Sequence, residues 1–233
     1  MLIDERSCVG CGECLKYCPM RAISLEGETA KVDQDLCAEC GVCARLGVCL
    51  EDAFVVPPEL PWPRSIRSIF SDPLTEFEAT GVTGRGTEEM KTNDVTERYK
   101  PGWVGVCVDV GRPNVGCRLR DIDTLARAIA LLGVEFETLN PVSYLMESKS
   151  MGALMKEVLD ERVVSGIIEF TIPVEKVVEV VQALKAVEGE VDTVFSVGVI
   201  SRVVDGDIPA RRHLESAGMS VAPNGKTNVG MGR

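Results

Sequence analysis

Residues 8–19 read CVGCGECLKYCP, and this stretch decides the fold of the first part of the chain. It contains four cysteines separated by two, two and three residues: Cys8, Cys11, Cys14 and Cys18. Two-residue gaps let a tightly turning backbone present three thiolates to one face of an iron–sulfur cubane. Gly10 and Gly12 keep side-chain bulk away from the metal, and Pro19 follows the last cysteine. The spacing therefore predicts thiolate ligation of a metal cluster.

The same pattern returns about 29 residues later. The second run consists of Cys37, Cys40, Cys43 and Cys49. Gly41 follows Cys40 much as Gly12 follows Cys11, which marks an internal repeat. The last gap differs, because five residues (Ala44 to Val48) precede the final cysteine and Leu50 takes the place of a proline. We expect a wider loop at this point.

On these motifs, residues 1–56 resemble the bacterial-type ferredoxins that carry two [4Fe-4S] clusters. In that family each run gives three ligands to one cluster and its last cysteine to the other. The resemblance implies that one cluster is held by Cys8, Cys11, Cys14 and Cys49. It implies that the second is held by Cys37, Cys40, Cys43 and Cys18. Because of the wider loop, we expect the Cys49-ligated cluster to be the more easily damaged, with a three-iron form as an alternative.

A zinc module is the competing interpretation of the cysteines, since C-x2-C pairs also build tetrahedral zinc sites. Such sites use pairs separated by a spacer, whereas two tandem triplets match cubane ligation. Eight of the ten cysteines lie between Cys8 and Cys49, and the N-terminus lacks the pattern of a secretory signal. We therefore predict metal ligation in a cytoplasmic, reducing compartment, with anaerobic metabolism as the setting. The remaining two, Cys107 and Cys117, are expected to be buried apolar residues.

Charge and composition exclude several function classes. The 233 residues include 25 Lys and Arg against 36 Asp and Glu, a formal charge of −11, which excludes a basic nucleic-acid binder. There is one histidine, His213, expected on a surface helix, and no catalytic residue is predicted. No apolar run is long enough for membrane insertion. The acidic field predicts a redox partner protein with a basic docking patch.

The chain is predicted to be α+β with several segments. Residues 22–33 alternate around Glu26-Gly27 and predict a hairpin over the clusters. Residues 57–102 begin with prolines and contain a Gly-rich stretch, which predicts a linker and a long loop. From residue 103 to 205 the patterns predict strands at 104–110, 134–139, 166–172 and 191–203. They predict helices at 121–132, 152–162 and 174–187. Residues 206–233 form a predicted C-terminal helix and Gly-rich tail.

This order resembles the ferredoxin-like βαββαβ sandwich with one extra helix, including the ACT-type domains that bind small ligands and dimerise. The resemblance is one of topology, and fold alone does not give function. It implies a domain for docking, ligand sensing or pairing of two subunits into a homodimer.

We predict an electron carrier, in preference to an autonomous enzyme. It would relay single electrons through two [4Fe-4S] clusters to a dedicated partner enzyme. The alternative is a reductase or reductive-activator subunit that binds an anionic small molecule between the 83–94 loop and the C-terminal tail. Positive charge for that ligand would come from Arg85, Lys91, Lys226 and Arg233. A third alternative is a cluster-assembly or regulatory subunit with transferable clusters.

Overall fold

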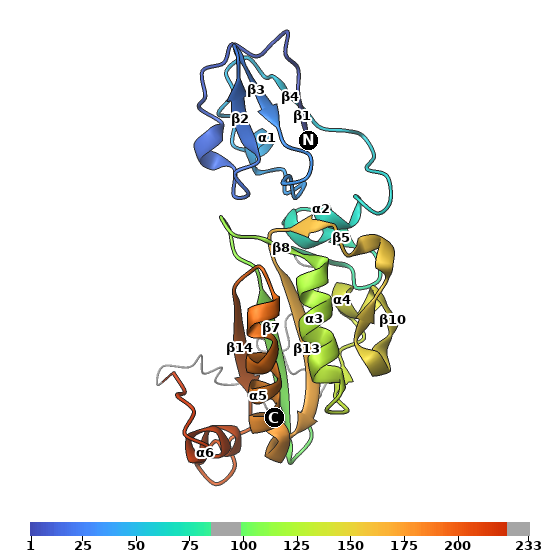
Figure 1. Cartoon of the computed structure of the whole chain (residues 1–233), viewed down its shortest axis with the longest axis vertical. Coiled ribbons are helices and arrows are strands. Elements are labelled where there is room, and N and C mark those ends of the chain that lie inside the picture. Colours follow the sequence, from blue (N-terminus) through green and yellow to red (C-terminus); the bar gives the residue numbers. More distant parts are fainter. Residues whose placement is uncertain (85–98, 223–233) are drawn as a thin grey trace.

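The computed structural model describes residues 1–84 and 99–222. Figure 1 shows a small lobe at one end of the molecule and a larger lobe at the other. We call residues 1–56 the head, and residues 64–84 with 99–222 the body. Both lobes contain helices and strands, so the chain is α+β as predicted.

The head is built around a hairpin. Strands β2 (Ile23–Glu26) and β3 (Thr29–Val32) pair antiparallel through a two-residue turn, as the alternating pattern predicts. Strand β1 (Leu2–Ile3) pairs with β4 (Phe54–Val55) and so joins the two ends of the head. Its helical turns are short, namely the 3-10 turn η1 (Leu15–Tyr17) and helix α1 (Val42–Arg45). The buried core is correspondingly small: Met1, Met20, Ala22, Cys37 and Ala38.

A four-stranded antiparallel sheet forms the centre of the body, in the order β14-β7-β13-β9. The long central strands are β7 (Trp103–Val110) and β13 (Gly166–Pro173), flanked by β14 (Phe195–Ile200) and β9 (Glu135–Phe136). Because side chains alternate across a strand, Val104, Val106 and Val108 all face one side. Helices α3 (Leu119–Ala130) and α5 (Val177–Val187) supply Ile122, Leu184 and other buried residues to that same core.

The opposite face of the sheet carries a second, small apolar cluster. Cys107 and Ile167 are buried there together with Tyr99. Gly105 leaves room for the Tyr99 ring, because a Cβ at that position would lie 2.3 Å from a ring carbon. Cys117, the other cysteine outside the head, is buried in the main body core. Both cysteines are therefore buried, as predicted.

The segment between the lobes is more ordered than its sequence indicated. Helix α2 (Ile66–Ser71) buries Ile66 and Phe70 in the body core. Strands β5 (Glu76–Phe77) and β6 (Val82–Thr83) follow as a short hairpin. In Figure 1 α2 lies at the end of the body that faces the head. The apolar pair of α2 is too short a pattern to be recognised as a helix from sequence.

The prediction of an extra helix at residues 152–162 is wrong. The region contains β10 (Met146–Ser148) paired with β11 (Ala153–Leu154), and β12 (Arg162–Val163) paired with β8 (Cys117–Arg118). Its helical turns are two short 3-10 segments, Lys149–Met151 and Lys156–Val158. Gly152 has a left-handed φ of 63°, and a Cβ there would lie 2.3 Å from the Ala126 carbonyl oxygen. Leu154 and Val158 are buried four residues apart, a spacing that imitates a helix.

Two further helices complete the body: the short α4 (Pro141–Tyr144), which follows β9, and α6 (Pro209–Ser216) near the C-terminus. His213 lies on α6 and is half-buried, with Leu214 beside it in the core. The predicted strand at 191–203 is shorter than expected, because β14 spans only Phe195–Ile200.

Candidate metal centres

Four cysteines from two distant segments line a cavity of about 160 Å³ in the head. They are Cys8, Cys11, Cys14 and Cys49. The walls between them are largely apolar and include Ile3, Ala30 and Phe54. We call this cavity the distal site, because it lies away from the body.

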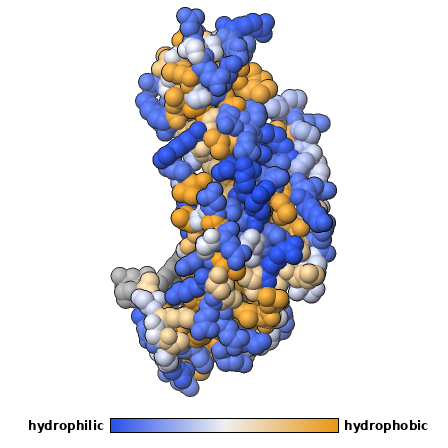
Figure 2. Space-filling view, in the orientation of Figure 1, coloured by the Kyte–Doolittle hydropathy of each residue, from blue (hydrophilic) through white to orange (hydrophobic). Residues whose placement is uncertain are grey.

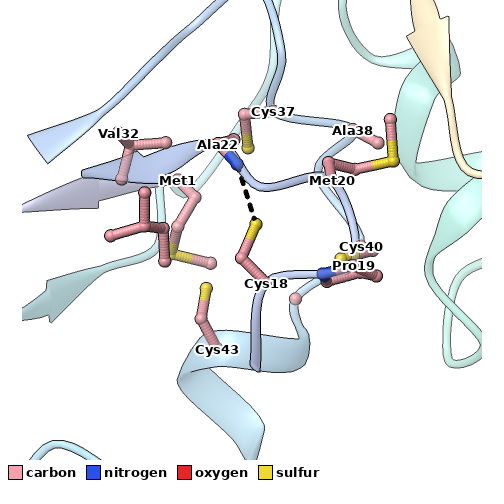
Figure 3. A pocket seen from close by; sticks show the side chains of 12 residues that line it. Met1, Cys18, Pro19, Met20, Ala22, Val32, Cys37, Ala38, Cys40 and Cys43 are labelled. Carbon is pink, nitrogen blue, oxygen red and sulfur yellow. Dashed lines mark hydrogen bonds between the residues drawn. The ribbon is translucent and has the colours of Figure 1, made fainter. Parts of the chain in front are cut away.

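The other four cysteines line a second, tighter cavity of about 20 Å³. They are Cys18, Cys37, Cys40 and Cys43, and Figure 3 shows them around one pocket. Met20 lines this pocket and also meets the body, where a Cβ at Gly116 would lie 2.2 Å from the Met20 methyl carbon. The backbone N–H of Asn114 in the body donates to the Pro19 carbonyl at 2.6 Å. We call this cavity the proximal site.

In each site, three cysteines of one run meet the last cysteine of the other run. This is the crossed grouping that the ferredoxin resemblance implies. Within residues 1–84 and 99–222, no three His, Cys, Asp or Glu side chains are gathered closely enough to hold a single metal ion. A donor set of four thiols around a small, largely apolar cavity fits a [4Fe-4S] cubane. The role of each cysteine as a ligand stays a prediction.

Backbone N–H groups point at several of these sulfur atoms. The Ala30 amide donates to Cys8 Sγ at 3.3 Å, which links the hairpin to the distal site. The Ala22 amide donates to Cys18 Sγ at 3.2 Å, as the dashed line in Figure 3 shows. Hydrogen bonds of this kind stabilise negative charge on sulfur and so influence the potential of a cluster.

The longer loop before Cys49 is accommodated by a change of helical turn. In the first run, the 3-10 turn Leu15–Tyr17 connects Cys14 to Cys18. In the second run, the α-helical turn Val42–Arg45 takes its place, and Gly47 adopts a left-handed φ of 61° before the chain reaches Cys49. Cys49 thereby reaches the distal cavity despite the two additional residues.

Burial raises the pKa values of the proximal thiols Cys37 and Cys40. For Cys43, burial and the neighbouring thiols Cys40, Cys37 and Cys18 raise the pKa to about 12. In the distal site, burial raises the pKa of Cys14. Without a metal, these four side chains are therefore thiols, and a bound metal would supply the positive charge that holds them as thiolates.

The two sites differ in their access to solvent. Cys11 in the distal site is exposed, whereas Cys37 and Cys40 in the proximal site are buried. Leu50 and Val9 at the edge of the distal cavity are 95% and 65% exposed. In the space-filling view, apolar atoms interrupt the hydrophilic surface of the head (Figure 2). The distal site is thus the more accessible of the two to an external molecule.

Three arginines near the proximal site were not singled out by the sequence, because no motif marks them. Arg45 donates to the carbonyl of Cys40 at 2.6 Å, and Arg67 donates to the carbonyl of Cys37 at 2.6 Å. Arg64 bonds Glu39 and Gln34 on the loop that carries these cysteines. The candidate anion-binding residues cannot be placed in this way: Arg85, Lys91, Lys226 and Arg233 lie outside the described residues. An anion site there stays a prediction.

Comparison with known proteins agrees with the cysteine geometry. A family described as a 4Fe-4S binding domain matches residues 1–24. A protein named "Ferredoxin-like protein in vnf region", from Azotobacter chroococcum mcd 1, is 40% identical over 60 residues, which cover 24% of this chain and 92% of that protein. The chain belongs to the ferredoxin-like proteins with a 4Fe-4S binding domain. Its head is an iron–sulfur electron-transfer module.

Two further relatives of this ferredoxin-like chain are much longer than the matched stretch. Pyruvate synthase subunit PorD from Thermotoga maritima is 37% identical over 59 residues, 25% of this chain and 58% of PorD. A component of an ion-translocating oxidoreductase complex from Methanosarcina acetivorans is 39% identical over 44 residues, 19% of this chain and 17% of that component. No solved structure matches the chain. None of the helices in the described part of the chain is long and apolar enough to cross a membrane.

Proposed function

We propose that the protein is an electron carrier with two [4Fe-4S] clusters, one in each cysteine-lined cavity. Cys8, Cys11, Cys14 and Cys49 would hold the distal cluster, and Cys18, Cys37, Cys40 and Cys43 the proximal one. The observation that carries this proposal is that each cavity is lined by four thiols in the crossed arrangement. When bound, each cluster accepts and releases one electron at a time.

Metal and sulfide analysis of the anaerobically purified protein tests this proposal. We expect about eight iron and about eight acid-labile sulfide per chain. Half of that content would mean that only one cavity is used. Stoichiometric zinc without sulfide would reject an electron-transfer function altogether.

We further propose that partners exchange electrons at the distal site. Exposed Leu50 and Val9 provide an apolar contact there, and the carboxylates of Glu13 and Glu51 border it. The head as a whole is acidic. A partner with a basic patch around an apolar centre is therefore the complementary surface.

The docking proposal is tested by kinetics with a basic cytochrome c as the electron acceptor. The rate should fall steeply as ionic strength rises, because salt screens the attraction. The double change Glu13→Gln and Glu51→Gln should slow the reaction, whereas the matched change Glu179→Gln and Glu188→Gln, on and just after α5 in the body, should not. Equal rates for both double variants would place docking elsewhere.

For the body, we propose the ferredoxin-like βαββαβ arrangement. It is supported by the strand order β14-β7-β13-β9, because the central pair, β7 and β13, are the first and third of these four strands along the chain. It is also supported by the two long helices, α3 and α5, which pack on one face of the sheet. The edge strand β14 offers a surface on which a second copy could pair. Sedimentation velocity of the holoprotein tests for a homodimer, and a single monomer species across concentrations rejects it.

We propose that the chain works in the cytoplasm as an electron-transfer subunit of a larger redox assembly. Two of the relatives are named as subunits, one of a pyruvate synthase and one of an ion-translocating oxidoreductase complex. The acidic head with its exposed distal site supports association with a protein partner. Anaerobic pull-down from the native source, followed by identification of a co-purifying redox enzyme, tests this assignment.

A further inference from the structure

The body reaches the proximal site through helix α2. Ile66 and Phe70 anchor this helix in the body core, while Arg67 between them turns toward the head. Arg67 is 5% exposed, so its guanidinium is almost entirely removed from solvent. A charge in such a place has to be paired and hydrogen-bonded.

The partners of Arg67 lie on both lobes. Its Nη1 atom donates to the Cys37 carbonyl at 2.6 Å and to the Gln34 carbonyl at 2.9 Å, with the Asp35 carbonyl at 3.3 Å. Its Nε atom pairs with the carboxylate of Glu161, which belongs to the body. The guanidinium therefore connects the peptide of a proximal cysteine to an acidic side chain of the other lobe.

The far end of α2 repeats this contact. Asp72, which follows the last residue of the helix, accepts a hydrogen bond from Arg45 at 2.8 Å. Arg45 in turn donates to the Cys40 carbonyl at 2.6 Å. The carbonyls of two neighbouring proximal cysteines are thus linked to the two ends of one body helix. No comparable contact with the body is present at the distal cysteines within the described residues.

We propose that Arg67 is a positioning residue through which the body sets the reduction potential of the proximal cluster alone. The inference rests on the proposed two-cluster function. Reduction by a donor protein adds one negative charge to a buried site, and a fixed guanidinium beside the Cys37 peptide stabilises that charge. Glu161 opposes this effect because it partly neutralises the guanidinium. Arg67 and Glu161 belong to the body and Cys37 to the head, so the potential of the proximal cluster depends on how the body packs against the head.

A purely structural role and an electrostatic role give different results for two variants. Arg67→Met removes the positive charge, so the proximal cluster should become harder to reduce. Glu161→Gln keeps the shape but removes the negative charge, so the same cluster should become easier to reduce. A structural contact that is merely loosened would move the potential in the same direction in both variants, or in neither.

The test is a redox titration of full-length holoprotein with dithionite, followed by electron paramagnetic resonance. The signal that disappears in Cys49→Ser is assigned to the distal cluster. For Arg67→Met we expect about a tenfold fall in the reduction equilibrium constant of the proximal cluster, which is about 59 mV for one electron. Glu161→Gln should shift the potential of the proximal cluster in the opposite direction, and Arg67→Lys should retain most of the wild-type value. The potential of the distal cluster should not change in any of these variants.

The control is Arg211→Met, which removes an arginine paired with Glu215 on α6, away from both cavities. It should leave both potentials unchanged. If Arg67→Met does not fold, the opposite shift in Glu161→Gln still decides the question. Loaded clusters with unmoved or equally shifted potentials overturn the role of Arg67, whereas a wild-type protein without iron and sulfide overturns the proposed function itself.

Discussion

The backbone N–H of Ala53 donates to Cys49 Sγ at 3.3 Å, four residues along the chain. The same relationship joins Ala22 to Cys18 at 3.2 Å. In both turns the residue before the alanine has a left-handed backbone, with φ of 49° at Asp52 and 52° at Arg21. The two crossing cysteines therefore occupy equivalent turns, although only Cys18 is followed by proline.

Because the two turns are equivalent, we predict that Cys18 and Cys49 play the same role, each as the fourth ligand of a different cluster. Cys49→Ser should convert or remove the distal cluster only, and Cys18→Ser the proximal cluster only, because each side chain lines one cavity. Iron content together with the electron paramagnetic resonance signals of both variants checks this. A Cys49→Ser protein with a perturbed proximal signal would show that the crossed assignment is wrong.

A second prediction concerns oxygen. The distal cavity is the larger one and includes the exposed Cys11, whereas the proximal cavity has buried Cys37 and Cys40. Solvent and oxygen reach the distal cluster more easily, so it should be lost first in air. Timed exposure followed by iron analysis and spectroscopy measures the order of loss. Simultaneous loss of both signals, or earlier loss of the proximal one, would contradict the prediction.

The sequence was most informative where local geometry decides the outcome. Alternation of apolar and polar residues along the chain is enough to predict the hairpin at 22–33. It also predicts the strand that ends at Val110 and the strand that begins at Gly166. The spacing of the two cysteine runs predicts cluster ligation because it is a local constraint, and the resemblance to ferredoxins implies which cysteines share a site.

The parts that escaped prediction depend on long-range contacts. Arg67 meets Cys37 thirty residues away and Glu161 ninety-four residues away, and nothing in its neighbouring sequence indicates either partner. At Gly152 the backbone is left-handed and lies too close to the Ala126 carbonyl for a Cβ, and the chain continues as β11 where sequence spacing predicts a helix. Tertiary contacts of this kind override local preference.

A third prediction is that cluster removal unfolds the head and leaves the body folded. The head has a small buried core that includes the predicted ligand Cys37, whereas the body has a large one that contains none of the eight predicted ligands. Without metal, the head lacks enough buried apolar area for independent stability. Hydrogen exchange after removal of iron should show protection lost in residues 1–56 and kept in β7, β13 and α3. Retained protection throughout the head would mean that its contacts with the body are sufficient.

The last prediction uses two glycines of the first motif that share a backbone conformation but differ in their surroundings. Gly10 and Gly12 have left-handed φ values of 66° and 74°, so alanine costs about 1 kcal/mol at either position. A Cβ at Gly10 would lie 2.3 Å from the Glu28 carbonyl oxygen in the hairpin turn, whereas at Gly12 it would meet only Leu25 Cδ1 at 3.5 Å. Gly10→Ala should therefore cost about 1–3 kcal/mol more, because the hairpin has to move away from the Cys8 loop. Anaerobic guanidinium titrations of the holoprotein, followed by cluster absorbance, compare the two variants. Equal midpoints would mean that backbone conformation, and not the close approach of the hairpin, requires glycine at this position.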